Sequence, residues 1–346
     1  MNLAPGRTLR SRVAGIFLFA PLLSRLGFDR LVTEAGSPGS EMVPAASALL
    51  SLLALTLLDK ERRSHIDDFN CFAGLNILPK KSFATDYSYR TVRAQQLSLL
   101  QGWVKALAPV MSPAAEGFAL DFHPIPYRGD PAGLDRHYLP RRGKAGPSVL
   151  TSFAREQTSR CLCYANANLA RADRNGELMR FVEFWRGVAS SDPKWLYFDS
   201  KVVDSPELSR VNQRKIHFVT IRRRGAAILR GLERQPASAW TKAVIDIPKR
   251  CHTQVRYLEE AVRLRGYEGP IRRIAVTGLG RDRPTLFLSH HFEETPRELI
   301  IRYAGRNRIE DGLGISVNFF HLDCLASEVR LNVDLDAALT VIANGC

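Results

Sequence analysis

The spacing of apolar residues divides the chain into a helical first part and a mixed remainder. Apolar residues recur every three or four positions through 14–32, 44–58 and 90–108, which is the period of an amphipathic helix. No run with strand-like alternation stands out before residue 110. The pattern therefore predicts an all-helical N-terminal region over 1–112.

Beyond residue 113 short apolar runs and strand-like alternation take over. Two short apolar runs, 117–121 and 195–199, each end in an aspartate. Strands are predicted at 148–153, 160–167, 215–222, 271–277 and 285–290. An amphipathic helix is predicted at 175–189, and helical spacing returns from about 296 to 345. This order of strands and helices predicts an α/β core.

Two apolar stretches resemble membrane or targeting segments but lack their defining features. The stretch at 14–23 follows three arginines, yet no small-residue cleavage site comes after it. The stretch at 44–58 is shorter than the ~20 residues that a membrane-spanning helix needs. Six cysteines in 346 residues are few and suggest a reducing compartment. We therefore expect a cytoplasmic protein with no membrane partner.

Positive charge is concentrated in one part of the sequence. The whole chain carries 49 Lys and Arg against 35 Asp and Glu, for a net charge of +14. Residues 208–283 alone hold 18 basic and 6 acidic residues, a net +12. The excess includes Arg222, Arg223 and Arg224 at the end of a predicted strand. Either this is an ordinary solvated surface, or it contacts phosphates and binds nucleic acid in a salt-sensitive way; the local excess favours the second.

Three acidic residues are candidates for chemistry. Asp121 and Asp199 end apolar runs, and ligands of α/β sheets sit at strand ends. Taken singly, an aspartate after a strand is also a common turn former or helix cap. Glu310 follows Tyr303 and Arg306 at a spacing that places all three on one face of a helix.

Other acidic and histidine clusters are weaker candidates. Asp130 and Asp135 rival Asp121 as a first acid, but their Gly- and Pro-rich surroundings favour a loop. The adjacent His290 and His291 would point to opposite faces of a strand. That arrangement argues against a shared metal ion.

Taken together, the three acids resemble the DDE transposases of bacterial insertion sequences. The resemblance is to the branch with a Tyr-x2-Arg-x3-Glu signature and a β-rich insertion before the glutamate. Its matches are 119–121, 196–201 followed by 217–223, and the signature Tyr303, Arg306 and Glu310. It covers roughly residues 115–340, and the signature is its most specific part.

The resemblance implies a fold. Residues 113–346 would form an RNase H-like α/β domain, a mixed sheet with flanking helices, interrupted by a basic β-rich insertion at about 225–295. The first aspartate would lie on the first strand, the second on the fourth, and the glutamate on a late helix. The helical region 1–112 would be a candidate for binding DNA ends.

It also implies a reaction. Asp121, Asp199 and Glu310 would be both catalytic and metal-binding, because three close carboxylates need cations to offset their repulsion. Two Mg²⁺ ions, with Mn²⁺ as a substitute, would support DNA nicking and strand transfer. Tyr303 and Arg306 would contact the DNA backbone. Double-stranded DNA, both element ends and target, would be the partner of a nucleoid-associated homodimer.

Two features depart from the pattern of that branch. A lysine is usual seven positions after the glutamate, where this chain has Val317, with Asn318 and His321 nearby. The chain also stops at Cys346, soon after the helix that carries Glu310. One alternative is therefore a decayed or truncated transposase that only binds DNA. Another is an RNase H-like nuclease with a different substrate.

Overall fold

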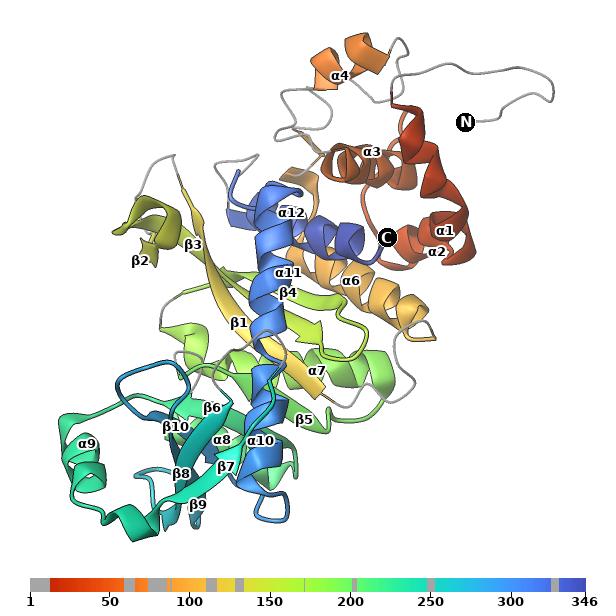
Figure 1. Cartoon of the computed structure of the whole chain (residues 1–346). Helices are drawn as coiled ribbons and strands as arrows, with labels where there is room; N and C mark the ends of the chain where they lie inside the picture. Colours follow the sequence, from red (N-terminus) through yellow and green to blue (C-terminus); the bar gives the residue numbers. More distant parts are fainter. Residues whose placement is uncertain are drawn as a thin grey trace.

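The N-terminal part of the chain is helical in the computed structural model (Figure 1). The structure describes residues 13–58, 66–73, 86–87, 89–109, 117–127, 134–170, 172–200, 204–247, 253–324 and 330–346. Its first helices are η1 (Ala14–Leu18), α1 (Ala20–Arg25), α2 (Phe28–Glu34), α3 (Ala45–Leu57), α4 (Ile66–Ala73) and α6 (Arg93–Leu107). The helical prediction is thus confirmed, whereas the predicted boundary at 112–113 lies outside the described residues.

The apolar stretch at 44–58 forms a short helix packed inside the protein. Most residues of α3 are buried, because α2 contacts it on one side and the C-terminal helix α12 (Arg330–Asn344) on another. Among the described residues, no helix combines the length and the apolar character needed to cross a membrane. One continuous buried cluster runs from these helices through α6 and α12 to the central sheet.

The described part of the chain forms a ten-stranded mixed sheet of mostly antiparallel strands. Its order is β2-β3-β1-β5-β6-β10-β9-β8-β7, and β4 pairs with β3. The strands are β1 (Gly117–Pro126), β2 (Arg136–Leu139), β3 (Lys144–Glu156), β4 (Leu162–Leu169), β5 (Trp195–Phe198), β6 (His217–Arg222), β7 (Thr241–Val244), β8 (Gln254–Val262), β9 (Ile271–Thr277) and β10 (Thr285–Ser289). Among the strands that the structure describes, only the pairs β1–β5 and β5–β6 are parallel.

Helices cover both faces of the sheet. They are α7 (Glu177–Ala189), α8 (Ser205–Gln213), α9 (Ala226–Glu233), α10 (Pro296–Ala304) and α11 (Asn307–Asn318), besides α12. On one face the apolar stripe of α7 packs Phe181 and Trp185 against Phe118, with ring centroids 5.2 and 4.4 Å apart. On the other face α10 buries Leu299, Ile300 and other residues against β5, β6, β8, β9 and β10. In Figure 1, α10 and α11 run one after the other across the front of the sheet.

Strand β1 does not end where the sequence suggested. The sequence placed Asp121 at the end of its apolar run, but β1 continues past Pro124 to Pro126 in register with β3. Proline is tolerated in a strand where its missing N–H has no ladder partner. On the other edge β5 pairs with β1 only as far as Leu120, so that edge is open beside Pro124. Asp121 therefore lies inside a strand.

The region 225–295 adds strands to the same sheet. After α9, strands β7 to β10 continue the sheet beyond β6. β9 and β10 match the predicted strands within a residue, whereas β7 and β8 were not predicted. β8 lacks a clear apolar alternation because Arg256, Glu259 and Glu260 interrupt it.

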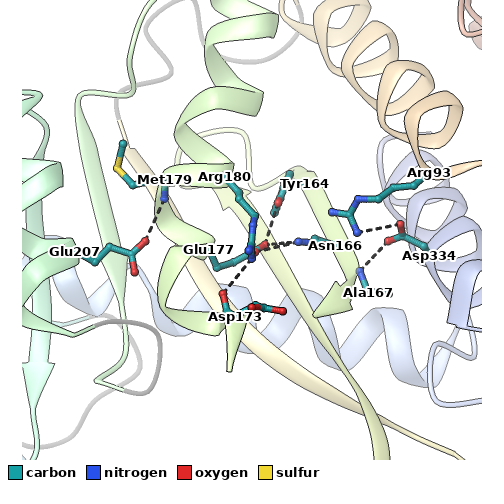
Figure 2. Close-up of polar contacts among 10 residues, drawn as sticks. All are labelled: Arg93, Tyr164, Asn166, Ala167, Asp173, Glu177, Met179, Arg180, Glu207 and Asp334. Carbon is teal, nitrogen blue, oxygen red and sulfur yellow. Dashed lines mark hydrogen bonds and ion pairs between the residues drawn. The ribbon is translucent and has the colours of Figure 1, made fainter. Parts of the chain in front are cut away.

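A buried polar network joins β4 to the helices around it (Figure 2). The Glu177 carboxylate accepts hydrogen bonds from the Tyr164 hydroxyl at 2.9 Å and from the Asn166 amide. Asp334 of α12 accepts from the Ala167 N–H at 2.8 Å and lies 3.6 Å from Arg93 of α6. Burial raises the pKa of Glu177 and of Asp334. These carboxylates hold elements together and were not singled out by the sequence.

Candidate active site

The sheet register brings Asp121 and Asp199 to neighbouring positions. In the parallel pair β1–β5 the last registered residues are Leu120 and Phe198, and the two aspartates follow them directly. Residues paired in this way point to the same face, on strands about 4.8 Å apart. Residues 78 positions apart in sequence thus meet on the face covered by α10 and α11. The resemblance implied that the two aspartates meet, and the pairing of β1 with β5, which the sequence alone does not show, is what brings them together.

Each aspartate is oriented by the main chain. Asp121 Oδ1 accepts a hydrogen bond from the Phe122 N–H at 2.9 Å, and Asp199 Oδ1 accepts one from the Ser200 N–H at 2.6 Å. Burial raises the pKa of Asp121, Arg306 opposes that rise, and the charges of Glu310 and Asp199 add to it. The three acids therefore influence one another electrostatically.

Arg306 is the central cation of the site. Its Nη2 lies 2.8 Å from Asp121 Oδ2, and its Nη1 donates to Glu310 Oε1 at 3.3 Å. The side chain is 7% exposed. The negative charge of Asp121, and more weakly of Asp199 and Glu310, raises the pKa of Arg306 against the effect of its burial. A buried guanidinium between carboxylates keeps them close without a metal ion.

The signature segment bends where the sequence suggested one helix. α10 ends at Ala304 and α11 begins at Asn307, so Arg306 caps the second helix. Tyr303 packs its ring against Phe287, with centroids 5.3 Å apart, and the Arg306 guanidinium lies 5.9 Å from the Tyr303 ring. The shared face survives the bend, because Arg306 and Glu310 still pair across one helical turn.

The Tyr303 hydroxyl is buried beside these charges. Among the described residues it has no hydrogen-bond partner. Burial raises the pKa of Tyr303, and Arg306 opposes the rise. A buried hydroxyl left without a partner costs free energy. It is therefore available as a donor to a ligand that enters the site.

The three acids do not close around a cation. Within the ranges that the structure describes, no group of three acidic, histidine or cysteine side chains could hold a metal ion. Glu310 is 60% exposed and turned to Arg306, whereas Asp121 and Asp199 lie deeper. The chemistry of the donors, carboxylate oxygens alone, suits Mg²⁺. In this arrangement, however, Arg306 supplies the positive charge.

The predicted basic residues continue the edge that carries Asp199. In the pair β5–β6, Phe198 is in register with Thr220, so Arg222, Arg223 and Arg224 follow within about 15 Å of Asp199, at ~3.3 Å per residue and ~4.8 Å per strand. Arg223 and Arg224 are exposed. Burial and the charge of Arg273 lower the pKa of Arg222.

A pocket lies beside this basic edge. It has a volume of about 700 Å³ between α9, strands β8 and β9 and the loop that leads to β10. Its wall carries Arg224, Arg230, Arg256 and Arg283, together with Trp240. The sequence predicted the charge excess but not the pocket, because residues from four elements converge only in the fold.

Two further polar contacts near the site were missed. His123 follows Asp121 by two residues and therefore lies on the same face of β1. Its Nε2 is 2.6 Å from Asp323 Oδ1 in the segment after α11. Arg141 donates to Asn318 at the end of α11. The spacing of Asp121 and His123 was the available signal for the first contact; the second had none.

The remaining candidates lie elsewhere. Asp130 is outside the described residues, and Asp135 precedes β2, beyond the end of β1. His290 and His291 follow β10 instead of lying on it, so strand alternation does not separate them. Both rings approach His217, with centroids 5.4 and 4.3 Å apart. Burial lowers the pKa of His290 to about 4.

Val317 occupies the position where the transposase branch carries lysine. It is 8% exposed and belongs to the main buried cluster, whereas Asn318 beside it is exposed and accepts a hydrogen bond from Arg141.

No protein-family model matches the chain. A search of curated proteins finds no match either.

Proposed function

We propose that the chain is a DNA transposase of an insertion sequence, a metal-dependent enzyme that nicks DNA and transfers strands at a DDE site. The observation that carries the proposal is the neighbouring position of Asp121 and Asp199 after registered residues of parallel strands, together with Arg306, the N-cap residue of α11, which pairs with both Asp121 and Glu310. Two aspartates 78 positions apart in the sequence are thereby neighbours, and Arg306 links one of them to Glu310, which supports the proposal.

The topology supports an RNase H-like assignment. Asp121 lies on the first strand, β1, and Asp199 follows β5, which is the fourth strand in chain order if the four-residue hairpin strand β2 is left out. Glu310 lies on a late helix that packs against β1. In this proposal 113–346 is the catalytic domain, 225–295 its insertion, and the helical region 1–112 binds DNA ends.

The side chains have distinct tasks. Asp121, Asp199 and Glu310 would hold the metal ions, once the exposed Glu310 side chain leaves Arg306 and turns inward. Two bound Mg²⁺ ions, or Mn²⁺, would stabilise the attacking and leaving oxygens of the phosphate. Arg306 orients Asp121 and donates to phosphate oxygens, for which its planar fork is suited. The Tyr303 hydroxyl is a second donor there.

The basic insertion and the three arginines directly before it bind the DNA backbone. Arg222, Arg223 and Arg224 lie on the same sheet edge as Asp199, and exposed arginines neutralise phosphates with release of counterions. Double-stranded DNA, both element end and target, is the partner. A homodimer brings two ends together, in the cytoplasm at the nucleoid.

A second candidate is a catalytically inactive transposase remnant that binds DNA. Arg306 already pairs with Asp121 and Glu310, and the core residue Val317 stands in place of the usual lysine. In this alternative Arg306 replaces the metal ions permanently.

A cleavage and strand-transfer assay separates the two candidates. The purified chain is incubated with DNA that carries the flanking ends of its gene, in Mg²⁺, Mn²⁺ or EDTA. The chain with Asp199→Ala should lose nicking by at least about 100-fold and keep salt-sensitive DNA binding. Glu310→Gln should act likewise, with Asp311→Asn, the exposed neighbour on α11, as its matched control.

Two other outcomes of this assay would assign a different function to the chain. DNA binding with no cut in either metal ion would contradict the enzyme and support the remnant. Metal-dependent cutting that never joins a 3′ end to target DNA would instead indicate a nuclease.

A further inference from the structure

A basic hairpin projects from the sheet on the side away from the insertion. It comprises β2, the short helix η3 (Pro140–Arg142) and the start of β3, and is called here the basic hairpin, residues 136–144. In Figure 1 it lies at the far end of the sheet from α9 and β7 to β10. It contributes nothing to the charge excess at 208–283.

The hairpin exposes positive charge without acidic residues. Its nine positions hold four Lys or Arg and no Asp or Glu, and all four basic residues are exposed: Arg136, Arg141, Arg142 and Lys144. In the described residues none of them forms an ion pair with a carboxylate; Arg136 donates to the Ala145 carbonyl at 3.0 Å. Tyr138, between them, is 62% exposed. An aromatic ring among unpaired cations is typical of nucleic-acid surfaces.

The fold fixes where these charges are. Leu139 is buried at 2% exposure and anchors the tip. Pro140 begins η3, and Gly143 ends it with φ +62°, a backbone conformation that favours glycine. β2 pairs with β3 from Arg136 to Leu139. The hairpin is thus built to hold its cations out from the sheet.

The hairpin is also tied to the helix that carries Glu310. Arg141 donates to Asn318, the last residue of α11. Glu310 and Asn318 are eight residues apart on that helix, about 12 Å at 1.5 Å per residue. Along β3, Lys144 lies nine residues from Phe153, the register partner of Asp121, or about 30 Å of extended strand. At 3.4 Å per base pair these distances correspond to roughly 4 to 9 base pairs from the acids.

We propose that the basic hairpin binds the phosphate backbone of duplex DNA about 4 to 9 base pairs from the cleaved bond. The insertion binds the element end on one side of that bond, and the hairpin binds the DNA on the other side. This inference rests on the proposed function for the position of the cleaved bond. It assigns flanking or target DNA to the hairpin, and the element end to the insertion.

The first experiment measures binding of a fluorescein-labelled 30-base-pair duplex against KCl concentration. The test variant combines Arg142→Ala and Lys144→Ala, two exposed residues outside the site. The control combines Arg186→Ala of α7 with Lys194→Ala just before β5, two exposed residues outside the basic hairpin and outside 208–283. The test variant should bind about 10-fold more weakly at low salt and lower the slope of log K against log [KCl] by about 2, near 0.9 per lost phosphate contact. An effect no larger than the control's would overturn the proposal.

A second series locates the contact. Duplexes that carry the gene's flanking end are extended past the cleavage point by 0, 4, 8 or 12 base pairs. Affinity of the unchanged chain should rise between about 4 and 9 base pairs, and the test variant should lose that rise. The assignment would be contradicted if the test variant also gained affinity with the longer duplexes. It would also be contradicted if the gain depended on the length of the element end instead of the DNA past the cleavage point.

The result is independent of cleavage. If the unchanged chain does not nick DNA, and the hairpin variant but not the control variant loses DNA binding, the proposed transposase activity is refuted. The contact of the hairpin with DNA is then still supported. If the unchanged chain nicks and the variant binds normally, the hairpin proposal fails and the enzyme stands.

Discussion

Replacing the buried Glu207 by glutamine should stabilise the protein in a pH-dependent way. Glu207 lies in the first turn of α8 and is fully buried. Its Oε1 accepts a hydrogen bond from the Met179 N–H at 3.3 Å (Figure 2), whereas Oε2 has no partner among the described residues. Burial raises the pKa of Glu207 from 4.5 to about 8, the Met179 N–H and Arg210 oppose the rise, and Asp204 and Glu177 add to it.

The magnitude follows from the rise of the Glu207 pKa from 4.5 to about 8. Because the pKa is higher in the folded state, folding is not penalised below pH 4.5, where both states are protonated. Stability is lost as pH rises from 4.5 through 8, at up to ~1.4 kcal/mol per pH unit. Glutamine keeps the Oε1 acceptor and does not ionise. The ceiling on its advantage between pH 5 and 8 is therefore ~4 kcal/mol, and local relaxation with water entry reduces this to about 2 kcal/mol.

Urea unfolding followed by tryptophan fluorescence measures this difference. The free energy of unfolding is determined at pH 5, 6, 7 and 8 for the unchanged chain and for Glu207→Gln. Glu41→Gln, at an exposed position, is the matched control and should show the same difference from the unchanged chain at every pH. A Glu207→Gln advantage that is equal at pH 5 and pH 8 would refute the assigned ionisation.

Two stability predictions concern the strands beyond β6. Arg272→Met should lower the free energy of urea unfolding by about 2–4 kcal/mol, because the 3% exposed guanidinium donates to Glu259 and to two main-chain carbonyl groups that would lose their donor. The control Arg273→Met removes a partly exposed ion pair and should lower it clearly less. Equal losses of stability in the two variants would contradict this assignment. Gly278→Ala should lower the free energy of unfolding by about 2 kcal/mol or more, because φ is +89° and a Cβ would lie 2.6 Å from the first carbonyl oxygen of β8. The control Gly231→Ala, in open space on α9, should be neutral or stabilising. A melting temperature unchanged by Gly278→Ala would contradict this prediction and show that the turn can relax.

Much of the secondary structure was predictable because it follows from local periodicity. The amphipathic helix predicted at 175–189 is α7, and the residues of its apolar stripe, Leu178, Phe181, Val182 and Trp185, are all buried. β6, β9 and β10 were predicted by their alternating or continuous apolar runs. Strands β2, β7 and β8 were not predicted, because charged residues interrupt their pattern and pairing with neighbouring strands decides their conformation.

The candidate site, too, was predictable only where it depends on local sequence. The residue types of Asp121, Asp199 and Glu310, and the spacing of Tyr303, Arg306 and Glu310, were legible in the sequence. Their use of Arg306 as a shared buried cation was not, because the contact of Arg306 with Asp121 joins residues 185 positions apart. The predicted single helix was wrong at residues 305–306, where α10 gives way to α11.

The sequence by itself determined the helical N-terminal region, the α/β character of the remainder, the local excess of positive charge and the identity of the candidate acids, because each depends on composition or on spacing within one element. Only the tertiary structure decided which strands are neighbours, that β1 runs past Asp121, and that the basic hairpin reaches α11. Strand register and helix packing join distant segments through burial and pairing, and no local pattern encodes which distant segment will be the partner.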